Sequence, residues 1–64
     1  MIGYVARDKD GNLYLYDDVP VYEEKSGCWF GSPDMIDITE RYPEFDNLQY
    51  TDEPVKVEIK LEKI

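Results

Sequence analysis

Apolar and polar residues alternate most strictly near the end of the chain. The aliphatic residues Val55, Val57, Ile59 and Leu61 alternate with Lys56, Glu58, Lys60 and Glu62. Successive side chains of a β-strand point to opposite faces, so this period of two predicts a long half-buried strand over residues 55–63. A helix is excluded because its period would scatter the four aliphatic side chains around the axis.

The beginning of the chain predicts a β-hairpin. Two β-prone runs, Ile2–Arg7 and Leu13–Tyr16, flank the turn formers of residues 8–12. The turn fits a two-residue loop at Asp10 and Gly11, or a three-residue loop with Gly11 in the left-handed region. The three-residue loop is preferred because it separates the side chains cleanly between the two faces. One face then holds Gly3, Val5, Leu13 and Leu15, and the other holds Tyr4, Ala6, Tyr14 and Tyr16. In this register Tyr4 pairs with Tyr16, Val5 with Leu15 and Arg7 with Leu13.

The middle of the chain is less regular. Residues 19–30 indicate a looser second hairpin, in which Trp29 and Phe30 point to opposite faces, so one of them should be partly exposed or covered by a later segment. Short strands are expected at residues 35–38 and 48–50. One helical turn over residues 39–45 is limited by Pro43, which disfavours helical geometry at Tyr42.

These elements predict a mainly all-β fold in a single domain over residues 1–64. We expect a small antiparallel β-roll or open barrel of about five strands, with at most one short helical turn near residues 39–45. The aliphatic face of the closing strand should either join the aliphatic face of the first hairpin or pack across it.

Charge is distributed unevenly along the 64 residues. The net charge is −8, and residues 17–53 carry eleven acidic residues against Lys25 and Arg41. Residues 54–64 have a small positive excess. An acidic middle disfavours nucleic acid and anionic membranes and favours a protein partner with a basic surface, although acidity can also serve solubility alone.

Cys28 is the single cysteine, so no internal disulfide can form and a cytoplasmic location is expected. Beside Trp29 it is interpreted as a small buried hydrophobic residue rather than a reactive thiol, because the chain has no histidine to activate it. No signal-peptide pattern opens the sequence. No apolar run approaches the roughly 20 residues needed to cross a bilayer.

Catalytic and metal-binding patterns do not emerge from the sequence. The turn over residues 8–12 differs from an EF-hand loop, because its glycine comes too early and position twelve is Val19. The adjacent acids at residues 17–18 and 23–24 are interpreted as solvated turns. Without histidine, a phosphate loop or a CxxC pair, we expect no enzyme, no metal and no cofactor.

Aromatic residues are in excess of what so small a core can use. The chain has six tyrosines, one tryptophan and two phenylalanines. The tyrosine face of the hairpin is either a second small core, covered by Tyr42, Phe45 and the hairpin of residues 19–30, or part of a binding surface. The candidate binding residues are Tyr4, Tyr14, Tyr16, Tyr22, Trp29, Glu23 and Glu24.

Four features resemble a group of short uncharacterised proteins of gut Bacteroides-type bacteria and their phages or mobile elements. They are the opening G-Y-V-A-R-D-K-D-G-N-L-Y-L-Y, a tryptophan near the middle, Y-P-E-F at residues 42–45 and D-E-P-V at residues 52–55. The resemblance covers about half of the chain, chiefly its first sixteen residues, and brings no established activity. It implies a context in which small phage-borne proteins act as inhibitors or accessories by binding a host component.

Two functions are therefore weighed. The first is a non-enzymatic acidic binding protein, a phage-type inhibitor or accessory that binds a host or defence protein through acidic and aromatic surface. The alternative is an oligomer that binds a small ligand such as a nucleotide signal, with tyrosines stacking on the base. A homo-oligomer is expected in either case, because a closing strand longer than its neighbours should overhang the sheet as an open edge. The lysines of this strand are equally suited to protecting the edge of a monomer.

Overall fold

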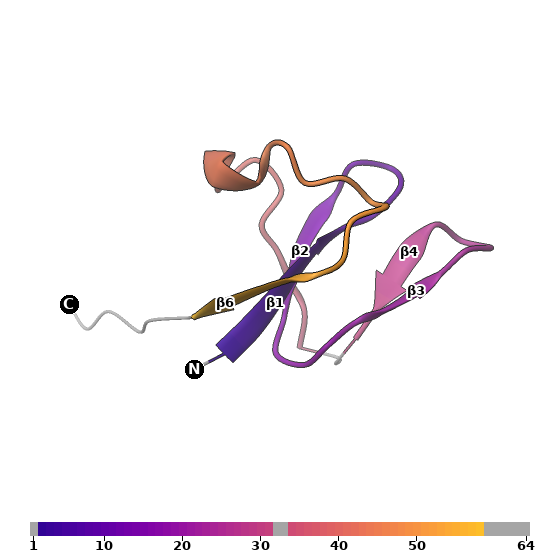
Figure 1. Ribbon diagram of the computed structural model, residues 1–64, viewed down its shortest axis with the longest axis horizontal. Helices are drawn as coiled ribbons and strands as arrows, with labels where there is room; N and C mark the ends of the chain where they lie inside the picture. The colour runs from indigo at the N-terminus through magenta and orange to yellow at the C-terminus, as the bar shows by residue number, and fades with distance from the viewer. Residues whose placement is uncertain (1, 32–33, 59–64) are drawn as a thin grey trace.

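The computed structural model describes residues 2–31 and 34–58, which form two antiparallel sheets (Figure 1). The elements are β1 (Ile2–Arg7), β2 (Leu13–Tyr16), β3 (Val21–Glu23), β4 (Cys28–Phe30), β5 (Ile36–Asp37), the 3-10 turn η1 (Pro43–Phe45) and β6 (Val55–Glu58). One sheet has the order β5-β2-β1-β6, and β3 and β4 form the other. The mainly β prediction is confirmed, and over the described ranges the strands do not close into a barrel.

The first hairpin has the predicted three-residue register. Tyr4 pairs with Tyr16, Val5 with Leu15 and Arg7 with Leu13. The loop closes through the Asp8 amide, which donates to the Asn12 carbonyl oxygen at 2.8 Å, and through the Gly11 amide, which donates to the Asp8 carbonyl at 3.0 Å. Gly11 has φ +100°. Any residue with a side chain would be strained in this conformation, so glycine is needed here.

The closing strand joins the first hairpin rather than crossing it. Val55 pairs with Val5 and Val57 with Gly3, so both valines lie on the aliphatic face and are half-buried. Lys56 is exposed on the other face, opposite Tyr4. The predicted alternation is confirmed for residues 55–58. The rest of the predicted strand, and with it the overhang, lies outside the described residues.

The aliphatic face carries the main core. Val5, Leu13 and Ile38 are buried there. The partly buried residues packed against them are Leu15, Phe45, Leu48 and Val57. Burying an aliphatic side chain of this size contributes roughly 1.5–3 kcal/mol. The core is thus closed by the segment around η1, which Figure 1 shows on one side of the four-stranded sheet.

The Arg7 side chain holds this segment against the sheet. Its Nε donates to the Leu48 carbonyl oxygen at 2.7 Å, and one of its terminal guanidinium nitrogens donates to the Phe45 carbonyl at 2.9 Å. The remaining nitrogen donates to the Gly11 carbonyl at 2.6 Å. The planar guanidinium thereby ties the hairpin loop and the η1 segment together.

Two expectations for residues 42–50 are corrected by this packing. Residues 48–50 form no strand, because Leu48 packs on the core while its carbonyl bonds to Arg7 and its amide bonds to the Phe45 carbonyl at 2.9 Å. Phe45 covers the aliphatic face instead of the tyrosine face, and Tyr42 joins it at a ring-centroid distance of 6.5 Å. The predicted limit set by Pro43 is confirmed: η1 begins there, and Tyr42 stays extended.

We expect Arg7→Lys to lower the free energy of unfolding by about 2 kcal/mol, since a lysine ammonium cannot reach three carbonyl oxygens in the geometry of the guanidinium. Arg41→Lys is the matched control, because Arg41 is exposed, and it should stay within about 0.5 kcal/mol of the unaltered protein. Urea unfolding at neutral pH measures both. Equal stabilities of the two variants would contradict the assigned role of Arg7.

Candidate binding site

The β3–β4 hairpin covers the tyrosine face of the four-stranded sheet. Tyr16 is 0% exposed, and its hydroxyl donates to the Trp29 carbonyl oxygen at 3.1 Å. Ala6 is buried on the same face. Gly31 lets the chain pass close to the tyrosine ring, because a Cβ at this position would lie 2.5 Å from Tyr16 Cδ2. The second core considered from the sequence therefore exists around Tyr16, with the 19–30 hairpin as its cover.

Asp8 fixes the position of this hairpin. It is buried, and its Oδ1 accepts a hydrogen bond from the Trp29 amide at 2.9 Å. The neighbouring Lys9 amide donates to the Gly27 carbonyl oxygen at 2.8 Å. Hydrogen bonds to a carboxylate are stronger than neutral ones, so the closed end of the first hairpin holds the beginning of β4 firmly.

Beside this anchor lies an open pocket of about 530 Å³. The residues that line it are Asp8, Asp10, Tyr14, Cys28, Trp29, Phe30, Gly31 and Met35. Two carboxylates, three aromatic rings and a thioether thus surround one space. The Asp10 carboxylate also accepts hydrogen bonds from the backbone amide of Asn12 at 3.0 Å and from its side-chain amide at 3.2 Å, which fix its rotamer. We call this space the acidic–aromatic pocket.

The electrostatic field in the acidic–aromatic pocket is negative. Burial raises the pKa of the Tyr14 phenol, and the charges of Asp37, Asp8 and Asp10 raise it further. Cys28 is half-buried rather than fully buried, and desolvation raises the pKa of its thiol, with the charge of Asp8 next in importance. Both shifts disfavour the anionic form of the side chain. The same field favours a positive charge placed in the pocket.

Exposed apolar side chains border the pocket. Phe30 is 55% exposed and Met35 is 46% exposed. Phe30 pairs across the hairpin with Val21, which is 69% exposed. Large exposed apolar side chains that lie together beside polar groups are typical of interaction surfaces.

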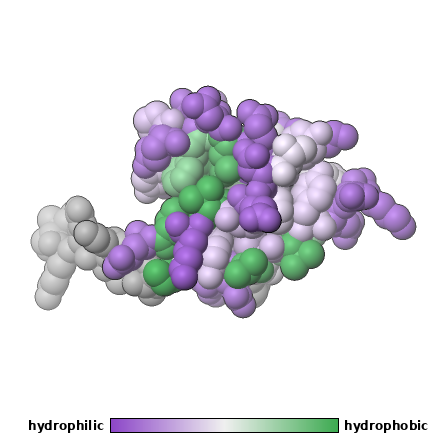
Figure 2. All heavy atoms as spheres, in the orientation of Figure 1, coloured by the Kyte–Doolittle hydropathy of each residue, from purple (hydrophilic) through white to green (hydrophobic). Residues whose placement is uncertain are grey.

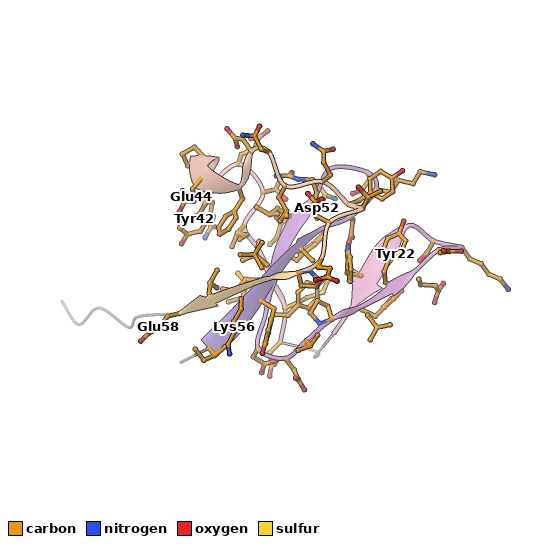
Figure 3. All side chains as sticks on the ribbon, viewed as in Figure 1. Tyr22, Tyr42, Glu44, Asp52, Lys56 and Glu58 are labelled. Carbon is orange, nitrogen blue, oxygen red and sulfur yellow. The ribbon has the colours of Figure 1, made fainter. Side chains whose placement is uncertain are left out.

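A second aromatic group packs against the indole outside the pocket. The Tyr22 and Trp29 ring centroids are 5.1 Å apart, and those of Tyr22 and Tyr50 are 6.3 Å apart. Figure 3 shows Tyr22 rising from the β3–β4 hairpin toward the segment that carries Asp52. The indole Nε1–H of Trp29 is buried without an acceptor among the described residues. Cross-strand packing therefore fixes the indole ring more firmly than hydrogen bonding does.

The residues predicted as a binding surface are divided among several places. Tyr14 and Trp29 meet in the acidic–aromatic pocket, whereas Tyr22 packs against Trp29 in a tilted arrangement and does not line the pocket. Tyr16 is a core residue with no exposed surface and has to be removed from the candidates. Tyr4 is half-buried opposite Lys56 on β6. Glu23 and Glu24 are exposed at the β3–β4 turn and do not line the pocket.

Sequence reasoning missed six of the eight residues that line the pocket: Asp8, Asp10, Cys28, Phe30, Gly31 and Met35. The predicted register already places Asp8 on the same face as Tyr14, and this parity was the available signal. Asp10 lies in the loop of the first hairpin, whereas Cys28, Phe30, Gly31 and Met35 come together with it only when the β3–β4 hairpin docks, which no local pattern indicates.

No family model matches the chain, and no curated protein or solved structure matches it. Within residues 2–31 and 34–58, no group of three acidic or cysteine side chains could hold a metal ion. The same part of the chain contains no helix long and apolar enough to cross a membrane.

Because the phenol of Tyr16 is buried, the free energy of unfolding should change with pH in the alkaline range. Burial, followed by the charge of Asp8, raises the pKa of Tyr16 to about 12, so the folded state holds this proton more tightly than the unfolded chain. The resulting stabilisation is complete below the ordinary tyrosine pKa of about 10 and is lost as the pH rises to about 12.

We therefore expect the free energy of unfolding to fall over this range, and to fall less steeply in Tyr16→Phe. Urea titrations at a series of pH values measure the slope. Tyr42→Phe, which removes an exposed phenol, is the control and should fall as steeply as the unaltered protein. Identical slopes in all three proteins would show that Tyr16 does not titrate as a buried group.

Proposed function

We propose that this chain is a non-enzymatic protein-binding domain whose acidic–aromatic pocket receives an arginine or lysine side chain of a basic protein partner. The observation that carries the proposal is the meeting of Asp8 and Asp10 with the rings of Tyr14, Trp29 and Phe30 around one open space.

The chemistry of the pocket suits a cation. A guanidinium or ammonium group can donate charge-assisted hydrogen bonds to a carboxylate, and Asp10 is exposed and held in place for this by Asn12. Aromatic faces attract the same cation, by about 0.5–2 kcal/mol for each good contact. Arginine suits the site better than lysine because its planar group can stack on a ring while it bonds to a carboxylate.

The surroundings of the pocket suit a protein rather than a free small cation. Phe30, Met35 and Val21 offer apolar area around a charged centre. A partner residue that enters the pocket would be flanked by apolar contacts, which exclude water and strengthen the central ion pair. The net charge of −8 draws a basic partner from a distance and accelerates encounter.

The biological setting of the proposal comes from the sequence resemblance. An inhibitor or accessory of phage type in the cytoplasm would bind a basic surface of a host or defence protein. A pocket for one basic side chain inside an apolar border is enough to block such a surface without any catalytic step.

Binding of a nucleotide signal, the alternative function, gains no support from the pocket. Its polar lining groups include the carboxylates of Asp8 and Asp10, which repel phosphate. Tyr16, one of the tyrosines expected to stack on a base, is buried under the β3–β4 hairpin.

Trp29, the single tryptophan, gives the experiment a local signal. We expect a blocked Leu-Arg-Leu peptide to change the Trp29 fluorescence in a saturable way at millimolar concentrations, and the Leu-citrulline-Leu peptide to bind several-fold more weakly. Citrulline has nearly the shape of arginine but no charge, so the difference isolates the cation.

Asp10→Asn should weaken binding of the arginine peptide about threefold to tenfold, because it removes a pocket charge but keeps an acceptor for Asn12. Asp18→Asn is the matched control. Asp18 also accepts a hydrogen bond from a backbone amide, that of Val19, and the variant removes the same charge at a position that does not line the pocket. If both variants weaken binding equally, the effect comes from the overall negative charge of the protein, and the proposal that the peptide binds in the pocket is wrong.

A further inference from the structure

β6 forms an open edge of the four-stranded sheet. It pairs with β1 on one side, and no other described strand pairs with its second side. The opposite edge strand, β5, has only two residues. An exposed edge strand presents unpaired N–H and C=O groups that can pair with another strand.

An apolar groove runs beside this edge. It has a volume of about 260 Å³, and six apolar or aromatic residues line it together with Glu44 and Glu58: Val5, Leu15, Ile38, Tyr42, Phe45 and Val57. Figure 2 shows apolar side chains gathered in this hollow, between the polar surface of the η1 segment and β6. The face of β6 that carries Val57 therefore continues into uncovered apolar surface.

The opposite face of β6 carries one residue of each charge. Lys56 and Glu58 are exposed, and Figure 3 shows both on the side of β6 away from Tyr42 and Glu44. Residues 54–64 have a small positive excess, whereas residues 17–53 are strongly acidic. Two copies that approach each other through β6 therefore avoid the part of the chain whose charges would repel most strongly.

We infer that two copies of this chain pair antiparallel along β6, with Val57 of one copy opposite Val57 of the other. In this register Lys56 of each copy lies opposite Glu58 of the other, which gives two cross-strand ion pairs on the solvated face. The two valines meet on the aliphatic face and join the two grooves into one apolar surface.

Other registers of the described strand are less favourable. Centring the pair on Lys56 opposes two lysines. Centring it between residues 56 and 57 opposes Lys56 to Val57, which places charged side chains on the aliphatic face. Of the three registers compared, the charge pattern of β6 favours the one centred on Val57.

The dimer also has a consequence for binding. The acidic–aromatic pocket lies on the tyrosine face, away from the β6 edge, so pairing leaves both pockets open. If the proposed function holds, the dimer presents two pockets and gains affinity for a partner with two basic sites. The dimer itself does not depend on that function.

Charge exchange tests the register directly. Light scattering across micromolar to millimolar concentrations should show the unaltered chain passing from 7.6 kDa to twice this mass. In a dimer of the Lys56→Glu variant, a glutamate faces a glutamate at both cross-strand positions, and in a dimer of the Glu58→Lys variant a lysine faces a lysine at both. Each variant alone should therefore raise the dimer dissociation constant about tenfold or more. An equimolar mixture should regain dimers, because the glutamate introduced at position 56 of one variant then faces the lysine introduced at position 58 of the other.

The matched controls carry the same charge changes at exposed turn positions. Lys25→Glu and Glu24→Lys alter the net charge by the same amounts as the two test variants, and both should dimerise as the unaltered chain does. A mass of 7.6 kDa at every concentration overturns the inference. Dimers of unaltered strength in either test variant, or a mixture that stays monomeric, overturn it as well.

Discussion

The structure depends on the alternation of side chains at the closed end of the first hairpin. Arg7 and Asp8 are neighbours in the chain, and because a strand directs successive side chains to opposite faces, they reach in opposite directions. Arg7 bonds to the carbonyl oxygens of Phe45 and Leu48 on the aliphatic face. Asp8 bonds to the Trp29 amide on the tyrosine face. Two covering segments, the η1 segment and the β3–β4 hairpin, are thus fixed from one point. In a 64-residue chain with a small core, such directed hydrogen bonds make up for limited apolar burial.

This arrangement also determines where binding chemistry can occur. The β3–β4 hairpin covers Tyr16 completely but stops short of Tyr14, whose phenol stays beside the carboxylates of Asp8 and Asp10. Tyr14 and Tyr16 lie on the same face of β2 but have different roles, because Tyr16 makes a core contact and Tyr14 forms a wall of the pocket. On the other face the η1 segment covers Val5 but leaves the groove beside Val57 open. The two open places lie on opposite faces of one sheet, so a partner and a second copy can be accommodated at the same time.

Local pattern was sufficient to predict the strands but not the layers. The register of the first hairpin follows from turn chemistry and from the separation of aliphatic and tyrosine side chains, both of which are properties of neighbouring residues. The side on which Tyr42 and Phe45 pack follows from the reach of Arg7, a contact between residues about 40 positions apart that no periodicity encodes. The sequence around Leu48 is typical of a strand, yet the Leu48 carbonyl oxygen accepts a hydrogen bond from the Arg7 guanidinium instead of from a neighbouring strand. The pocket was missed for the same reason, because Phe30 and Met35 reach Asp10 only after the hairpin has docked. Of the two sequence candidates that line the pocket, Tyr14 has a position that follows from the register of the first hairpin, whereas Trp29 reaches the pocket only through the docking of β4.

The central claim is that the two faces of one sheet are covered by two separate segments. Proton–proton NOEs in solution test it most directly. The account predicts contacts between the Gly31 α-protons and the Tyr16 ring, and between the Phe45 ring and the methyl groups of Val5, in the same spectrum. Contacts from the Phe45 or Tyr42 ring to Tyr14 or Tyr16, with none from Gly31, would place the η1 segment on the tyrosine face and contradict the account.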